Sequence, residues 1–222
     1  MKTTMTIHQL LPIAQALALL VAQAGLGNAS LSAAVVYQEP YGGPVGVSGA
    51  RLLPYQYLGV RFSLTEPTQL TSIHSEFGAL GENGTYFAAL ISLPSVNSLP
   101  QGSPFNLGDV LYSTQFTLSF GPSRPLEIPF PVTLNAGAYG LIFGGNTAIE
   151  GYIRNYQQVA GSSSFRWSTG PWPTGWFDEP EGPTWNLSLE GVVVPEPSAY
   201  VLLTIAMVAL LVRKRGTKDA AS

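Results

Sequence analysis

The chain has 222 residues, a formal net charge of −3 and no cysteine, which excludes disulfides, thiolate metal sites and cysteine nucleophiles. Residues Val35 to Val194 contain eleven acidic residues, five arginines and no lysine. A nucleic-acid partner is therefore excluded, because its phosphates would need a basic patch. This central part is long enough for one domain with a substantial hydrophobic core.

The N-terminus has the layout of a secretory signal peptide. Lys2 precedes an apolar run from Leu10 to Leu26, and the small residues Ser32 to Ala34 follow it. We expect residues 1–34 to be a secretory signal peptide, with a signal helix N-terminal to the domain, and we expect a signal peptidase to cleave after Ala34. Cleavage near Ala29 is the alternative cut, and an uncleaved signal anchor is the alternative role.

The body between the two ends alternates apolar and polar residues with a period of two, most clearly from Val110 to Phe120. This pattern is typical of half-buried strands. Similar alternation or short apolar runs occur at Leu58–Leu64, Thr71–Phe77, Phe87–Leu93, Leu126–Leu134, Tyr139–Phe143, Tyr152–Tyr156, Ser164–Trp167 and Trp185–Val194. Strands at this spacing predict an all-β domain over residues 35–193, an antiparallel two-sheet sandwich of the jelly-roll type.

Three prolines mark one of these strands as unusual. Pro125, Pro129 and Pro131 lie on the polar side of the segment Leu126–Leu134. Proline cannot donate a hydrogen bond to a neighbouring strand. We therefore expect this strand at the edge of a sheet, where prolines also prevent pairing with another chain.

The four tryptophans fall within nineteen residues of each other. Trp167 and Trp185 belong to strand-like alternation, so we expect them to pack in the core. Trp172 and Trp176 lie in the segment Gly170–Trp176, which reads as a loop. Exposed rings there could stack on sugars, which makes a carbohydrate-binding module the first alternative function.

An acidic cluster of Asp178, Glu179 and Glu181 follows these rings. It has three readings: a solvated loop, a calcium site with oxygen ligands, or one half of a glycosidase acid pair. It lacks the regular spacing of a calcium loop, and the partners for catalysis would be the distant Glu150 or Glu190. A carboxylate-dependent glycoside hydrolase is therefore the second alternative function, with Trp172, Trp176 and the three acids as candidate ligand-binding residues.

The sequence contains few residues that could support other kinds of catalysis. His74 is the only histidine outside the signal segment, and strand alternation places it on the solvent side. No serine lies in a nucleophile elbow. We expect no catalytic residue, no metal site and no cofactor.

The body resembles the β-rich "choice-of-anchor" exported domains over roughly Leu58 to Gly191. The segments that carry this resemblance are LTSIHSEFG, GTYFAALISL, LPQGSPFNLGDVLYSTQFTL and VTLNAGAYGLIFGG. They are patterns of strands and turns, so the resemblance supports the fold and implies no activity.

The C-terminal residues 194–218 combine three signals in a fixed order. The triplet Pro195, Glu196 and Pro197 precedes an uncharged apolar run, Ser198–Val212, and a basic cluster follows it: Arg213, Lys214 and Arg215. As a helix, the run would be about 22 Å long at ~1.5 Å per residue. The hydrocarbon core of a bilayer is about 30 Å thick, so a helix of this length suits a temporary anchor. The basic cluster should stay cytoplasmic.

This order resembles the PEP-CTERM sorting signal. The resemblance implies an exported, non-enzymatic protein that is held transiently in the inner membrane, processed by an exosortase at Pro195–Pro197, and delivered to the cell surface or extracellular matrix. It also implies an association with exopolysaccharide. An ordinary tail anchor and a buried C-terminal helix are the alternative readings of this segment.

Overall fold

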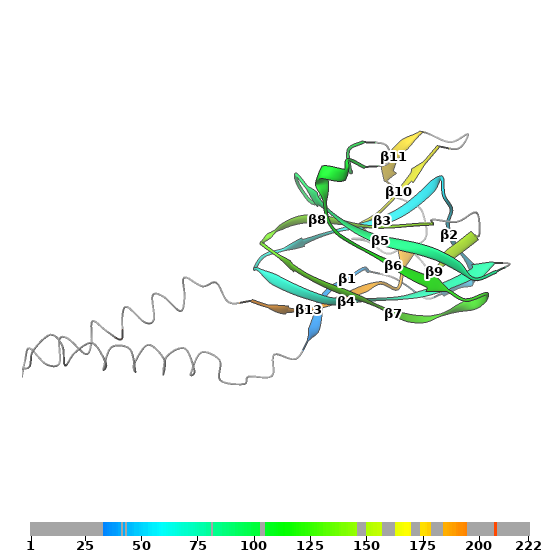
Figure 1. Cartoon of the computed structure of the whole chain (residues 1–222), viewed down its shortest axis with the longest axis horizontal. Helices are drawn as coiled ribbons and strands as arrows, with labels where there is room; N and C mark the ends of the chain where they lie inside the picture. The colour runs from blue at the N-terminus through cyan, green and yellow to red at the C-terminus, as the bar shows by residue number, and fades with distance from the viewer. Residues whose placement is uncertain are drawn as a thin grey trace, which may run out of the picture. The chain divides into compact units, whose positions relative to one another are not determined.

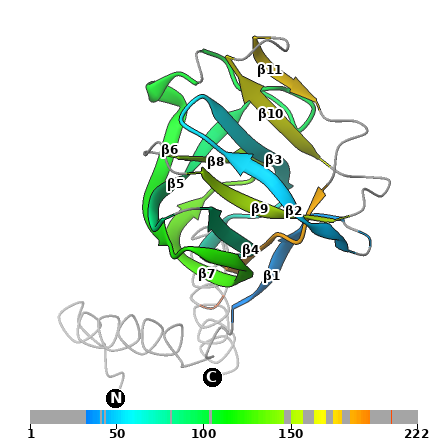
Figure 2. The ribbon, with the colours of Figure 1, turned by 90° about the vertical axis from the view of Figure 1, so that its right-hand side faces the viewer.

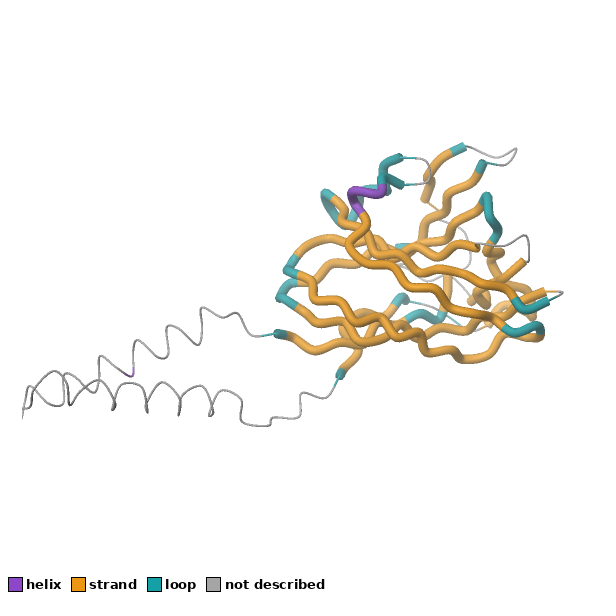
Figure 3. Tube along the Cα trace, in the orientation of Figure 1, coloured by secondary structure: helices purple, strands orange, loops and turns teal. Residues whose placement is uncertain are grey.

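Strands make up almost all of the regular structure in the computed structural model of the chain (Figure 3). The structure describes residues 33–40, 42, 44–80, 82–102, 105–145, 150–156, 163–169, 174–178, 184–194 and 207. The elements are β1 (Ala34–Gln38), β2 (Pro44–Leu52), β3 (Gln56–Leu64), β4 (Thr68–Leu80), β5 (Gly84–Leu93), the 3₁₀ turn η1 (Leu107–Asp109), β6 (Val110–Leu118), β7 (Gly121–Leu134), β8 (Gly137–Gly145), β9 (Glu150–Tyr156), β10 (Ser164–Ser168), β11 (Gly175–Asp178), β12 (Thr184–Trp185) and β13 (Ser188–Val193).

The strands form two antiparallel sheets, as the alternating sequence predicts (Figure 1). The first sheet has the order β11-β10-β3-β8-β5-β6. In the second, β4 pairs with β7 along one edge, and along its other edge with β13 and then β9. β1 extends this sheet beyond β13, and β2 extends it beyond β9. We refer to them as the β3/β8 sheet and the β4/β7 sheet.

The main core lies between the two sheets. Its largest fully buried side chains include Phe62, Phe77, Phe130, Phe143 and Trp185. Inward-facing residues alternate with outward-facing ones, for example in β3, where Leu58, Val60 and Phe62 are buried in this core. Burial of each such side chain contributes about 1.5–3 kcal/mol.

The β3/β8 sheet is apolar on its outer face as well. In β5 the main core receives Tyr86, Ala88 and Leu90, whereas Ile91 and Leu93 join a second apolar cluster with Ile142 and Phe165. The alternation over Phe87–Leu93 predicts a half-buried strand, with apolar residues on one face only. Both faces of this strand are instead covered, which the continuous apolar run in its sequence reflects.

The expected edge strand is confirmed. β7 is longer than predicted, and within the described residues it pairs only with β4. Pro125, Pro129 and Pro131 are exposed along it. The prediction for Phe120 is wrong, because β6 ends at Leu118 and Phe120 is 65% exposed. The chain changes direction there at Gly121, whose φ of +136° favours glycine.

The two ends of the described domain lie side by side. Ala33–Val194 forms one compact unit, in which β1 (blue in Figure 2) pairs antiparallel with β13. In the strand register Ala34 lies opposite Gly191. The Val194 N–H donates to the carbonyl of Pro67 at 2.8 Å. Of the predicted tail helix only Met207 is described. Residues 1–32 of the predicted signal segment lie outside the described residues, whereas Ala33 and Ala34 are described and Ala34 begins β1. Within the described part of the chain, no helix has the length and apolarity needed to span a membrane.

Candidate functional site

A row of aromatic rings covers the outer side of the β3/β8 sheet, and we call it the aromatic face. Three adjacent strands supply four of its rings, and in the strand register Trp167 of β10 lies between Tyr57 of β3 and Trp176 of β11. Ring centroids lie 6.4 Å apart for Trp176 and Trp167, and 5.1 Å apart for Trp167 and Tyr57. The aromatic face consists of Tyr57, Phe87, Phe105, Phe165, Trp167 and Trp176.

Two glycines allow these rings to lie close to the sheet. A Cβ added at Gly144 would lie 2.3 Å from the Tyr57 ring and 2.6 Å from the Phe87 ring. At Gly59 it would lie 2.4 Å from the Phe165 ring. Such distances are far below van der Waals contact, so the ring positions depend on glycine at both places.

The tryptophans divide between this face and the main core. Trp185 is fully buried between the sheets, and Trp167 is 6% exposed within the aromatic face. Both are buried as predicted, although in different places. Trp176 is half-buried and belongs to β11, so its placement in a loop is wrong; the short strand starts at Gly175. Trp172 lies outside the described residues.

The acid next to Trp176 is part of a charge pair. The Asp178 carboxylate lies 2.7 Å from the guanidinium of Arg61, and these side chains are 52% and 12% exposed, respectively. Arg61 also lies over the Phe165 ring at 5.7 Å. Asp178 therefore neutralises an almost buried cation at the border of the aromatic face. Glu179 and Glu181 lie outside the described residues.

A shallow groove of about 440 Å³ lies at the other end of the aromatic face. Phe87 and Phe105 form its aromatic side, and Ser113 and Gln115 of β6 lie opposite Ala89 and Phe87 in the strand register. The described lining contains no charged side chain; it consists of Phe87, Ala89, Phe105, Val110, Ser113, Thr114 and Gln115. We call it the neutral groove.

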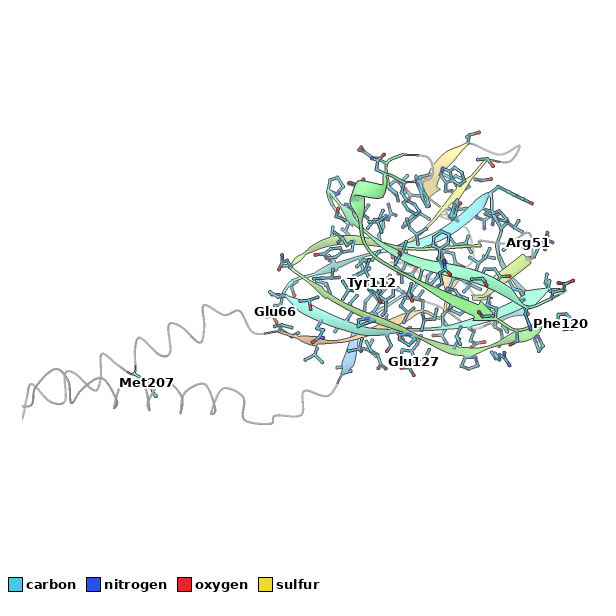
Figure 4. All side chains as sticks on the ribbon, viewed as in Figure 1. Arg51, Glu66, Tyr112, Phe120, Glu127 and Met207 are labelled. Carbon is cyan, nitrogen blue, oxygen red and sulfur yellow. The ribbon has the colours of Figure 1, made fainter. Side chains whose placement is uncertain are left out.

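The outer side of the β4/β7 sheet has a charged groove of about 530 Å³. It contains His74 with Glu76, Glu127 and Glu190 (Figure 4 labels Glu127). The His74 Nε2 atom lies 2.9 Å from the Ser72 hydroxyl and 3.5 Å from the Glu190 carboxylate. A catalytic triad uses the two ring nitrogens for different partners, whereas both contacts here involve Nε2. The arrangement therefore differs from that of a serine hydrolase.

The acids proposed as distant catalytic partners do not converge on Asp178. Glu150 belongs to β9 and Glu190 to β13, both in the β4/β7 sheet, whereas Asp178 belongs to the opposite sheet. Glu150 pairs with Arg51 at 3.3 Å. Within the described residues, no group of three or more His, Cys, Asp or Glu side chains is arranged to hold a metal ion.

A buried polar cluster that the sequence does not reveal joins β1 to the start of β10. The carboxylate of Glu39, which is fully buried, accepts hydrogen bonds from the Ser163 N–H at 3.0 Å, the Ser163 hydroxyl at 2.8 Å and the Tyr37 hydroxyl. Burial, followed by the charge of Glu39, raises the pKa of Tyr37 well above its usual range. Glu39 follows an ordinary strand and no local pattern identifies it as buried.

The aromatic residues outside the tryptophan cluster were also missed. Tyr57, Phe87 and Phe105 come from segments that are far apart in the sequence, and alternation shows only which side a strand residue faces. A partial signal was available at Gly59 and Gly144, because a glycine within a strand can mark close approach by another group.

Comparison of the sequence with models of known protein families gave no match, and neither did comparison with curated proteins.

Proposed function

We propose that the chain is an exported, non-enzymatic surface or matrix protein that is sorted and processed through a PEP-CTERM tail. The observation that best supports this proposal is the pairing of the first and last strands, in which Val35, the first residue after the predicted cleavage site, lies opposite Glu190. Directly opposed residues in an antiparallel pair have Cα atoms about 4.5–5.5 Å apart. The signal segment and the tail are thus attached to neighbouring points of one domain, so both can approach the same membrane surface.

The position of the triplet fits processing next to a folded domain. The last described hydrogen bond of the domain is made by the N–H of Val194, and Pro195, Glu196 and Pro197 follow in the sequence. These residues and the basic cluster Arg213, Lys214 and Arg215 lie outside the described residues. An exosortase that acts at the triplet would leave all of β13 with the released domain.

Within this proposal we assign the domain to the jelly-roll sandwiches. The support is a nested pairing of eight consecutive strands: β5 with β6, β4 with β7, β3 with β8, and β2 with β9. A long hairpin rolled into two sheets pairs its strands in this order. β1, β10, β11, β12 and β13 then extend the two sheets.

Mass spectrometry of the intact protein tests the sorting proposal. The protein would be recovered from its producing strain and from the same strain without its exosortase. We expect loss of the residues after the triplet only when the enzyme is present, together with any mass that the enzyme attaches. The variant Glu196→Ala should retain the tail in both strains. An identical full-length C-terminus in both strains with the unmodified chain would contradict the proposal.

We also propose, as a second candidate, that the domain binds a neutral polysaccharide. The supporting observation is the neutral groove, which is lined by the rings of Phe87 and Phe105 together with hydroxyl and amide side chains of β6. Apolar ring faces match the C–H surfaces of a sugar, and hydroxyl and amide groups match its hydroxyls. The half-buried Trp176 at the far end of the aromatic face extends the surface available to a chain of sugars.

Affinity electrophoresis with dextran and with exopolysaccharide purified from the producing strain tests this second candidate. Phe105→Ala should reduce the affinity at least tenfold, because it removes one ring of the groove. Phe120→Ala makes the same change at a 65% exposed phenylalanine elsewhere and should leave binding unchanged. No retardation by either polysaccharide, or equal retardation of both variants, would rule the neutral groove out as the binding site.

A further inference from the structure

The open edge of the β3/β8 sheet is β6, which within the described residues pairs only with β5. Its core-facing rings, Tyr112 and Phe116, are only half-buried, whereas Tyr86 and Leu90 of β5 face the same core and are fully buried. The difference shows that solvent reaches the core side of β6 from beyond the sheet edge (Figure 4 labels Tyr112).

From Tyr112 to Leu118 this edge has none of the usual features that prevent pairing with another chain. The strand reads VLYSTQFTL, without charge, proline or glycine. Its register with β5 is regular from Leu118 back to Tyr112. By contrast, β7 carries Pro122, Pro125, Pro129 and Pro131, and β11 is only four residues long. Long, flat and uncharged edges are the ones that recruit another strand.

We propose that β6 is an assembly edge, which pairs antiparallel with β6 of a second copy of this chain. Such a dimer has two-fold symmetry, with its axis passing between the two β6 strands. Side chains alternate in a strand, so residues 113, 115 and 117 lie on the outer face whichever of them is on this axis. The outward residues of the strand are Leu111, Ser113, Gln115 and Thr117, and none of them carries a charge that would repel the other copy. On the inner face, each copy shields Tyr112 and Phe116 of the other copy from water. This burial of apolar surface favours the dimer.

Such a dimer would double the six-stranded sheet and place the two neutral grooves on the same outer surface. One edge buries less area than a standard protein interface, so the contact should be weak in dilute solution. It becomes effective where copies are concentrated, as on a cell surface or in a matrix. The pairing depends only on β6 and therefore does not depend on the sorting proposal.

The absence of cysteine from the chain allows a direct test by cross-linking. Single variants Ser113→Cys, Gln115→Cys and Thr117→Cys would be made in the full chain and oxidised, and dimers would be measured on non-reducing gels. Directly opposed residues meet the Cα separation of about 4.4–6.8 Å that a disulfide requires. We expect one of the three to give at least ten times more dimer than Gln69→Cys. Gln69 is an exposed residue of β4, and β4 pairs with strands on both sides at this position.

A second variant distinguishes strand pairing from collision of exposed thiols. In the most reactive cysteine variant, lysines replace both outward residues two positions away, for example Leu111→Lys and Gln115→Lys beside Ser113→Cys. When residue 113 lies opposite itself, the lysine at position 115 of each copy faces the lysine at position 111 of the other, and like charges there oppose pairing. We expect at least a fivefold loss of dimer. Equal cross-linking at Gln69 and at all three β6 positions, or no effect of the two lysines, would overturn the proposal.

Discussion

At the scale of single residues, the buried carboxylate of Glu39 links two distant segments of the chain. It lies just after β1 and accepts hydrogen bonds from Tyr37 and Ser163, so it ties the first strand to the start of β10. Glu39→Ala would leave the buried donors of these residues without their acceptor, at a cost of about 1–3 kcal/mol for each donor left unsatisfied. We expect a fall of this size in the free energy of unfolding, measured by urea denaturation. Glu66→Ala, at an exposed glutamate, should change it by less than about 0.5 kcal/mol, and equal losses for the two variants would contradict this role.

Because of Tyr37, the stability of the folded domain depends on pH in the alkaline range. Burial and Glu39 raise its pKa, so the folded state keeps the phenolic proton at pH values where the unfolded state has lost it. The stabilisation is complete below the ordinary tyrosine pKa of 10.0 and is lost as pH rises above it. Burial also raises the pKa values of three other tyrosines, Tyr57, Tyr86 and Tyr139. They change the stability in the same direction as Tyr37. Tyr37→Phe should therefore lose less stability than the unmodified chain between about pH 8 and pH 11 in urea titrations. A parallel decline in the two proteins would show that Tyr37 does not titrate in this way.

At the scale of elements, β8 supports the aromatic face through Gly144. A methyl group there would overlap the rings of Tyr57 and Phe87, so Gly144→Ala should force both rings to move. Overpacking of this kind costs typically about 1–3 kcal/mol. We expect a loss of that size in unfolding free energy, together with a changed near-ultraviolet circular dichroism spectrum from the displaced rings. Gly108→Ala is the matched control, because its methyl group would meet nothing within 4 Å. Unchanged ring spectra in Gly144→Ala would show that the face does not depend on this glycine.

The same elements show what the sequence could predict. Alternation identified β3, β5 and β6, because each places apolar residues at every second position over most of its length. It missed β1 and β2, which adjoin the predicted signal segment and a glycine-rich stretch, and it missed the four residues of β11. Alternation also assigns a residue to a face without naming its neighbours. The meeting of Tyr57 with Phe87 and Trp167 depends on pairings between distant strands, which no local pattern contains.

At the scale of the whole molecule, β1 holds the last strand of the domain in place. β13 lies between β1 and β4, so each side of the segment before the predicted sorting tail is paired. Val36 is half-buried and packs against the main core, whereas its neighbour Val35 is 55% exposed. Val36→Asp should therefore detach β1 and leave β13 as an open edge, and Val35→Asp should leave the pairing intact.

Hydrogen exchange of the amides in Ser188–Val193 measures this dependence directly. Backbone amides exchange when their hydrogen bonds open, so losing the β1 partner should speed exchange at least tenfold, equivalent to about 1.4 kcal/mol of local stability. We expect this increase in Val36→Asp and little change in Val35→Asp, with protection of β3 and β8 retained in both. Fast exchange throughout Val36→Asp would indicate global unfolding and would contradict a local role for β1. Unchanged exchange in Ser188–Val193 would show that β4 alone holds the final strand, and that the paired ends do not depend on each other.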